Sequence, residues 1–404
     1  MVMLSPGAAV RSDQVPSAAR GRRPRVLFFS MQTDEDIYGG TRSLLMALAN
    51  LREMDAVVVA ALPSPDHPLA AELRRVGVEH EILAAPPPRT GRWGRLARAR
   101  EVNRMLLPVL RRHAPDAVHT DAETFLSAVH AARRAGCRAV MHVRGVQPGG
   151  RVRMLRQLLL ATADRTVFIT ESLRGYYLER VAPPLRARLR RRSRTIHNGF
   201  ALAEMRQYQE RVSRERARAE LGMAEGEVAV AIVAGIYPAK GQLPFLESVA
   251  PALLRDNPDV RLWLVGGEKK PAYAARCRAA VKAAGLEERV VFTGYRPDVY
   301  LWYRAMDVLA FPSEREGMGR VAIEAQAFGV PVVASDIVGI RDALHDGDGG
   351  YLVSTAGEWI DRLAALVRDP GLRRTLGARG RVFAGRFDVR RVTRDLEALY
   401  LDWP

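Results

Sequence analysis

The chain has 404 residues, enough for two domains, and 48% of them are hydrophobic, enough for two buried cores. It has no apolar run of the roughly 18 residues that a membrane-spanning helix needs. Its first 24 residues lack the continuous apolar segment of a secretory signal. Cys137 and Cys277 lie far apart without metal-ligand spacing, so we expect reduced thiols in a cytoplasmic protein.

The net charge of +17 is concentrated in the first half of the chain. Residues 1–200 hold 33 basic and 17 acidic residues, whereas residues 201–404 hold 29 and 28. Only four of the 62 basic residues are lysines, but a genomic bias towards arginine would act on both halves equally. The asymmetry predicts an anionic partner for the N-terminal half. Nucleic acid is not the expected partner, because no interleaved aromatic residues or recognised module accompany the arginines.

The first half of the chain alternates short apolar runs with helical patterns. Residues 1–24 mix Pro, Ser, Ala and Arg without periodicity, and we expect them to form a disordered tail. The predicted strands are 25–30, 56–62, 116–120, 139–143, 166–170 and 194–200. Alternation of this kind predicts a parallel sheet with helices on both faces.

The second half restarts the same alternation after a polar helical stretch. Its predicted strands are 227–235, 260–267, 289–294, 308–311, 332–334 and 351–353. We therefore expect an α/β protein with two doubly wound domains. The predicted division is a tail at 1–24, an N-terminal domain at 25–205, a C-terminal domain at 206–387 and a final helix within 388–404.

The most informative stretch begins at the predicted strand 308–311. A polar loop follows and ends in Gly317-Met318-Gly319, and a helical pattern then runs to Gly329. The first-turn N–H groups and the dipole of such a helix favour phosphate oxygens, and Arg320 adds a positive charge.

Two carboxylates flank this phosphate cradle. Glu316 precedes the helix, and Glu324 follows after seven intervening residues. Each carboxylate can accept hydrogen bonds from hydroxyl groups, so the stretch fits a nucleoside diphosphate that carries a sugar. The alternative is a tight turn between two solvated glutamates. A nicotinamide dinucleotide is not expected, because no acidic strand end follows about 20 residues later.

The pattern of Glu316, seven residues and Glu324, within EGMG…EA…GVPVVAS, resembles the donor-site motif of family 4 glycosyltransferases. The resemblance extends over most of the chain from about Arg25. It implies a GT-B fold, in which two Rossmann-like domains face each other across a cleft and the C-terminal helix returns to the N-terminal domain. It also implies a retaining enzyme that uses nucleotide sugars, with Glu316 facing the sugar hydroxyls and Glu324 facing the ribose.

Further candidate site residues lie at predicted strand ends. Gly39 and Gly40 follow the first strand and resemble the glycine loop of the family's N-terminal domain, the alternative being a tight turn. Lys240 follows the first strand of the second half, where an ammonium group can neutralise a leaving diphosphate. The family has an arginine five residues before this lysine, but here that residue is Gly235, and we expect Arg320 to supply the missing charge.

His142 ends a predicted strand of the first half. The resemblance implies that it contacts the donor sugar as a catalytic residue beside Glu316, and the alternative is a hydrogen-bonded core histidine. We expect no metal and no cofactor. The Asp34-x-Asp36 pair precedes the glycine loop, and no third carboxylate is placed to complete a metal site.

The sequence predicts a retaining hexosyltransferase that moves a sugar from a UDP- or GDP-sugar to a lipid-linked or saccharide acceptor in cell-envelope polysaccharide, lipopolysaccharide or glycolipid synthesis. The alternatives are a small-molecule acceptor, a sugar-nucleotide epimerase of the same fold and a basic nucleic-acid-binding protein. The predicted helices 93–113 and 151–161 mix arginine with apolar residues. They suggest peripheral docking on the anionic inner face of a membrane, unless their apolar faces pack on the protein's own sheet.

Overall fold

The structure is a computed structural model, and it describes residues 22–31, 39–87, 91–121, 125–146 and 163–402. Residues 1–21 of the predicted tail, the Asp34-x-Asp36 pair and the predicted helix 151–161 lie outside the described residues.

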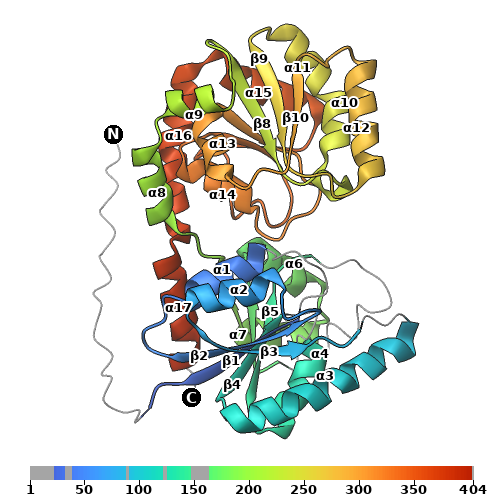
Figure 1. Cartoon of the computed structure of the whole chain (residues 1–404), viewed down its shortest axis with the longest axis vertical. Coiled ribbons are helices and arrows are strands. Elements are labelled where there is room, and N and C mark those ends of the chain that lie inside the picture. The colour runs from blue at the N-terminus through green and yellow to red at the C-terminus, as the bar shows by residue number, and fades with distance from the viewer. Residues whose placement is uncertain (1–21, 32–38, 88–90, 122–124, 147–162, 403–404) are drawn as a thin grey trace.

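The N-terminal half forms a seven-stranded parallel sheet with the order β3-β2-β1-β4-β5-β6-β7 (Figure 1). Its strands are β1 (Arg25–Met31), β2 (Asp55–Leu62), β3 (Glu79–Ala84), β4 (Ala117–Asp121), β5 (Arg138–Val143), β6 (Arg165–Phe168) and β7 (Ser193–Thr195). Its helices are α1 (Gly39–Leu48), α2 (Pro68–Val76), α3 (Gly91–His113), α4 (Phe125–Arg134), α6 (Glu171–Arg180) and α7 (Pro183–Arg192). The central strands are continuous apolar runs because helices cover both faces of the sheet. Strand β3 was not predicted, because its residues Glu79, His80 and Glu81 suit an edge strand and interrupt the apolar pattern.

The C-terminal half forms a six-stranded parallel sheet with the order β10-β9-β8-β11-β12-β13. Its strands are β8 (Val228–Val233), β9 (Val260–Val265), β10 (Val290–Gly294), β11 (Val308–Phe311), β12 (Val332–Ser335) and β13 (Gly350–Val353). Its helices are α10 (Gln242–Ser248), α11 (Ala250–Asp256), α12 (Pro271–Ala283), α13 (Val299–Ala305), α14 (Arg320–Ala327), α15 (Ala356–Arg368) and α16 (Pro370–Ala384). Helices α8 (Leu202–Arg211) and α9 (Arg214–Glu220) connect the two halves and contact α13.

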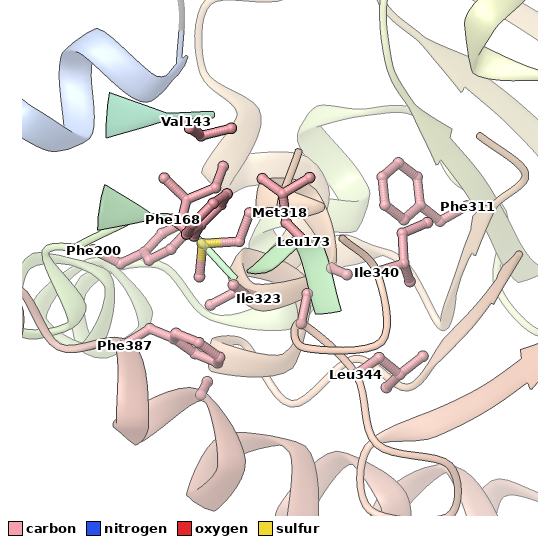
Figure 2. Packing of buried hydrophobic residues seen from close by; sticks show 14 of the residues in the cluster. Val143, Phe168, Leu173, Phe200, Phe311, Met318, Ile323, Ile340, Leu344 and Phe387 are labelled. Carbon is pink, nitrogen blue, oxygen red and sulfur yellow. The ribbon is translucent and has the colours of Figure 1, made fainter. Parts of the chain in front are cut away.

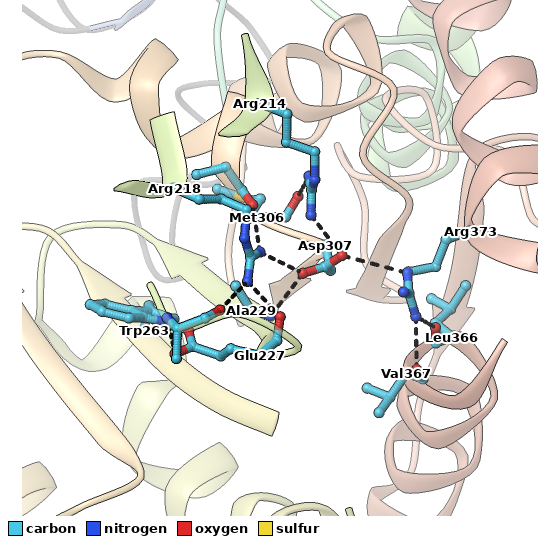
Figure 3. Close-up of polar contacts among 12 residues, drawn as sticks. Arg214, Arg218, Glu227, Ala229, Trp263, Met306, Asp307, Leu366, Val367 and Arg373 are labelled. Carbon is cyan, nitrogen blue, oxygen red and sulfur yellow. Dashed lines mark hydrogen bonds and ion pairs between the residues drawn. The ribbon is translucent and has the colours of Figure 1, made fainter. Parts of the chain in front are cut away.

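An ionic network built around Asp307 fixes α9 to the C-terminal sheet (Figure 3). Arg214 approaches the Asp307 carboxylate at 2.7 Å, Arg218 at 3.2 Å and Arg373 at 3.7 Å. The same carboxylate accepts a hydrogen bond of 2.9 Å from the backbone N–H of Ala229 at the start of β8. One carboxylate therefore joins α9, α16 and the first strand of the second sheet.

The last helix, α17 (Val389–Leu401), returns to the N-terminal sheet, where it packs against α1 (Figure 1). The hydroxyl of Thr393 donates a hydrogen bond of 3.1 Å to the carbonyl of Ala47, and the carboxylate of Glu397 accepts the backbone N–H groups of Arg52 and Glu53. The amphipathic pattern of this helix places its apolar face in the core of the N-terminal domain. The predicted fold, with two Rossmann-like domains and a returning C-terminal helix, is confirmed.

One apolar cluster runs through both domains, and Figure 2 shows some of its residues. Met318 of the C-terminal domain belongs to the same cluster as Val143, Phe168 and Leu173 of the N-terminal domain. The two domains therefore meet through buried apolar side chains beside the Gly317-Met318-Gly319 segment.

None of the described helices is long and apolar enough to cross a membrane. In α3, the side chains of Val102, Leu106 and Leu110 are buried in the core of the N-terminal domain. This part of the helix thus uses its apolar face to pack on its own sheet.

Candidate functional site

Lys240 and Glu316 lie together at the carboxyl end of the C-terminal sheet. Lys240 ends a short 3₁₀ helix (Pro238–Lys240) after β8, and Glu316 lies in the loop after the neighbouring strand β11. The Lys240 ammonium donates a hydrogen bond to Oε1 of Glu316, and only 19% and 14% of the two side chains are exposed. Burial opposes the positive charge, but Glu316 and Tyr237 outweigh it and raise the pKa of Lys240. A charged lysine and a carboxylate are therefore held side by side where α/β sheets bind ligands.

The predicted phosphate cradle is also a contact between the two domains. A Cβ atom on Gly317 would lie 2.1 Å from the backbone oxygen of Arg144, so only glycine allows this approach. Met318 is buried, and the backbone N–H of Asn198 donates to its sulfur at 3.2 Å. Gly319 caps α14 with φ at 57°, in the left-handed region that favours glycine. The segment thus brings Arg144, two residues after His142, against the residue that follows Glu316.

Arg320 and Glu324 form an ion pair on α14. Nη2 of Arg320 lies 2.9 Å from Oε1 of Glu324, and the hydroxyl of Tyr303 donates to Oε2 at 2.9 Å. Burial and the Glu324 charge raise the pKa of Tyr303 well above its usual value. Because a carboxylate has about four acceptor positions, two remain on Glu324 for other hydroxyl groups.

The other end of Arg320 contacts the N-terminal domain. Its Nη1 donates a hydrogen bond to the hydroxyl of Ser43 on α1, and its guanidinium lies 4.5 Å from the ring centre of Phe200. Arg320 is therefore paired with Glu324 and linked to α1 by Ser43.

The side chain of Lys269 packs over the backbone of Gly235. A Cβ atom on Gly235 would lie 3.3 Å from Cγ, Cδ and Cε of Lys269. The loops after β8 and β9 are joined there, because Ile236 N–H donates to the carbonyl of Gly267 at 2.8 Å. The structure thus brings a second lysine to the strand end that carries Lys240, although the two are 29 residues apart in sequence.

His142 ends β5 inside the N-terminal domain and is buried. Its Nδ1 lies 2.9 Å from Nε2 of His119 and 3.3 Å from Nη2 of Arg144. Burial, together with Arg144 and His119, lowers the pKa of His142 well below its usual value, so the ring is neutral near pH 7. Its Nε2 is buried without a hydrogen-bond partner among the described residues.

Gly39 and Gly40 form the first turn of α1, the helix that carries Ser43. The predicted glycine loop therefore begins the N-terminal element that Arg320 contacts. Within the described ranges, no three His, Cys, Asp or Glu side chains are grouped so that they could hold a metal ion.

Several residues that hold the site residues and the two domains in place were not predicted from the sequence. Ser43 and Tyr303 bind Arg320 and Glu324, and the carboxylate of Asp342 accepts the backbone N–H groups of Glu171 and Ser172 at 2.6 and 3.0 Å. The last contact places a C-terminal-domain carboxylate at the N-terminus of α6. These partners come together only when the chain is folded and the domains pack, so no local sequence pattern predicts them.

The two doubly wound sheets, the returning helix α17 and the lysine–glutamate pair at a sheet edge define a GT-B protein. Residues 39–191 match the family model described as a glycosyl transferase 4-like domain, and residues 227–369 match that of glycosyl transferases group 1. The chain belongs to the GT-B glycosyltransferases of family 4, as its motif indicated.

Solved structures of low sequence identity share the whole fold. The crystal structure of Anabaena Alr3699/HepE in complex with UDP has a TM-score of 0.76 and 20% identity, covering 94% of this chain and 100% of that one. A glycosyltransferase from Rickettsia africae has a TM-score of 0.78 and 16% identity, covering 94% of this chain and 98% of that one.

Among curated relatives, the D-inositol 3-phosphate glycosyltransferase of Nocardia farcinica is 40% identical over 182 residues, which are 43% of this chain and 40% of the relative. The enzyme of the same name from Corynebacterium glutamicum is 35% identical over 195 residues, 46% of each chain. The matched region thus spans less than half the length of these relatives.

Proposed function

We propose that the protein is a retaining glycosyltransferase that moves a sugar from a nucleotide sugar to an acceptor. The contact between Lys240 and Glu316 is the observation that carries this proposal. It provides a cation for the leaving diphosphate and a carboxylate for the sugar hydroxyls at one sheet edge. As the glycosidic bond breaks, the ammonium and the backbone N–H groups at the start of α14 stabilise the developing negative charge. No cofactor takes part in this proposal, and the donor is a substrate.

The donor we propose is a UDP-sugar, with a GDP-sugar as the alternative. Supporting this choice, the Anabaena HepE protein of the same fold has been crystallised with UDP and with UDP-glucose. Glu324 retains two acceptor positions beside its bonds to Arg320 and Tyr303, which suits a pair of ribose hydroxyls. Glu316 is the matching acceptor for the hydroxyls of the transferred sugar.

The acceptor we propose is anionic, in a cell-envelope polysaccharide, lipopolysaccharide or glycolipid precursor. The excess of 33 basic over 17 acidic residues in the first 200 supports this choice. The Nocardia relative is named for a phosphorylated inositol, and one protein of the same fold, WaaG, is described as involved in lipopolysaccharide biosynthesis. A phosphorylated small molecule is the alternative acceptor.

The test is a product assay with UDP-glucose, with and without D-inositol 3-phosphate or a lipopolysaccharide core oligosaccharide. We expect release of UDP that depends on the acceptor, with a product heavier by one hexose in mass spectrometry. Release of UDP from UDP-sugars at the same rate without any acceptor would instead identify an epimerase or a hydrolase. A protein that releases no nucleoside diphosphate from UDP- or GDP-sugars with any of these acceptors would contradict the proposal.

We also propose that the N-terminal domain docks at the inner face of an anionic membrane. Arg188, Arg190 and Arg191 on α7 are exposed, and basic side chains near anionic lipid contribute about 1 kcal/mol each. Because Val102 and Leu106 of α3 are buried, the attraction rests on charge and should fall steeply with salt. The test is co-sedimentation with phosphatidylglycerol vesicles at low and physiological salt. Protein that stays in the supernatant at both would contradict docking.

A further inference from the structure

We propose that His119 and Tyr400 are positioning residues for His142. Together they present the Nε2–H group of His142 to an oxygen atom of the bound sugar donor. The identity of that ligand rests on the proposed function, whereas the arrangement of the three side chains does not.

The three side chains form an unbroken chain of contacts from three elements. The hydroxyl of Tyr400, on α17, lies 2.5 Å from Nδ1 of His119, on β4. Nε2 of His119 lies 2.9 Å from Nδ1 of His142, on the neighbouring strand β5. Arg144 reaches the same Nδ1 atom of His142 at 3.3 Å.

Arg144 fixes the direction of every hydrogen bond in this chain. A guanidinium group can only donate, so Nδ1 of His142 must accept. The proton of a neutral His142 ring therefore lies on Nε2. His119 must then donate from its own Nε2, and its Nδ1 accepts the hydroxyl proton of Tyr400.

Burial keeps all three groups neutral. It lowers the pKa of His119 to about 3, lowers the pKa of His142 well below its usual value and raises the pKa of Tyr400. Phe28 stacks on the His119 ring with a centroid distance of 4.9 Å, which further restricts that ring. The tautomers are thus set by hydrogen bonds and packing.

The end of the chain distinguishes a ligand-binding role from a purely structural one. Most buried side-chain nitrogens are hydrogen-bonded to the protein or to ordered water. Nε2 of His142 is instead buried with no partner among the described residues. A sugar oxygen that accepts this N–H would remove the cost of leaving it unpaired, so binding energy is available at this atom.

The arrangement assigns a role to the returning helix. Tyr400 lies in the last turns of α17, a helix that follows the C-terminal domain in sequence yet packs in the N-terminal core. The helix therefore supplies the outermost member of the hydrogen-bonded chain that ends at His142.

The tautomers can be measured directly by nitrogen-15 NMR of histidine-labelled protein, with His142→Ala and His119→Gln to assign the signals. We expect both rings to be neutral and protonated on Nε2 between about pH 6 and 8. A His142 that carries its proton on Nδ1, or becomes charged in this range, would overturn the proposal. This measurement needs no substrate, so it stands apart from the proposed function.

Kinetics test the positioning role. A His119→Phe variant loses the donor to His142, whereas His119→Gln keeps an N–H near the position of Nε2. We expect His119→Phe to lower kcat about tenfold with the Kd for UDP unchanged, and His119→Gln to recover most of the loss. Tyr400→Phe should give a smaller decrease in kcat.

His67→Phe is the matched control, because His67 is also buried in the N-terminal domain but caps α2 through Leu69 N–H. It should lower Tm and leave kcat unchanged. Equal losses of kcat in His67→Phe and His119→Phe, or wild-type kcat in His119→Phe, would overturn the positioning role. A wild-type protein that binds no nucleoside diphosphate would instead contradict the proposed function.

Discussion

Acidification from pH 7.5 to 5.5 should destabilise the protein through its two buried, neutral histidines. Folding lowers the pKa of His119 to about 3 and that of His142 well below its usual value, whereas an unfolded histidine titrates near pH 6.5. The unfolded chain therefore binds more protons below pH 6.5, so the free energy of unfolding falls as the pH falls. Each ring contributes on the order of 1 kcal/mol over this range, and the two together about 2–3 kcal/mol.

Calorimetry can measure this effect as a change in Tm. For a chain of 404 residues that unfolds as one unit, a change of about 2–3 kcal/mol in the free energy of unfolding corresponds to roughly 3 °C in Tm. Replacing both histidines with glutamine should reduce the acid-induced fall in Tm by that amount, while contributions from other groups cancel in the comparison. An identical pH dependence in the wild type and the double variant would refute the conclusion that these rings are neutral when folded.

Four substitutions test the other interactions. Glu316→Ala should lower turnover about a hundredfold without unfolding the protein, because charge-assisted hydrogen bonds to the sugar are lost; activity within a few-fold of wild type would contradict this role. Lys240→Ala should weaken binding of UDP more than of uridine in calorimetry, and equal losses would show that the ammonium does not contact phosphate. Lys269→Ala should also weaken UDP binding, and recovery of binding in the double variant Lys269→Ala/Gly235→Arg would show that this strand end needs a cation. An unaltered Kd for UDP in Lys269→Ala would exclude a contact between Lys269 and the diphosphate. Asp307→Ala should reduce the free energy of unfolding by about 3 kcal/mol, measured by urea denaturation, because three arginines lose their partner; a change below 1 kcal/mol would count against the network.

The fold was predictable because its signals are local. Apolar runs such as the one in β11 alternate with helical patterns, and Gly329 ends the helical pattern of α14 with φ at 77°. The edge strand β3 was not predicted, because Glu79 and Glu81 interrupt the apolar pattern that is typical of buried strands. The return of α17 came from the family resemblance, and its amphipathic pattern does not say which sheet it covers.

The site was predictable only in part. The positions of Lys240 and Glu316 at strand ends follow from the α/β pattern, and the structure brings the two side chains together. The expectation that Arg320 replaces the charge missing at Gly235 did not include its pairing with Glu324 or the presence of Lys269. Such contacts join different loops and domains, so they depend on packing and leave no pattern in one sequence.

Calorimetric titration of the full chain with UDP, GDP and uridine tests the central claim most directly. We predict that the wild type binds UDP or GDP. If UDP is the ligand, uridine should bind more weakly than UDP, and Lys240→Ala should remove most of this difference in affinity. Wild-type protein that binds neither UDP nor GDP, or binds them equally well without Lys240, would contradict a nucleotide-sugar site at this sheet edge.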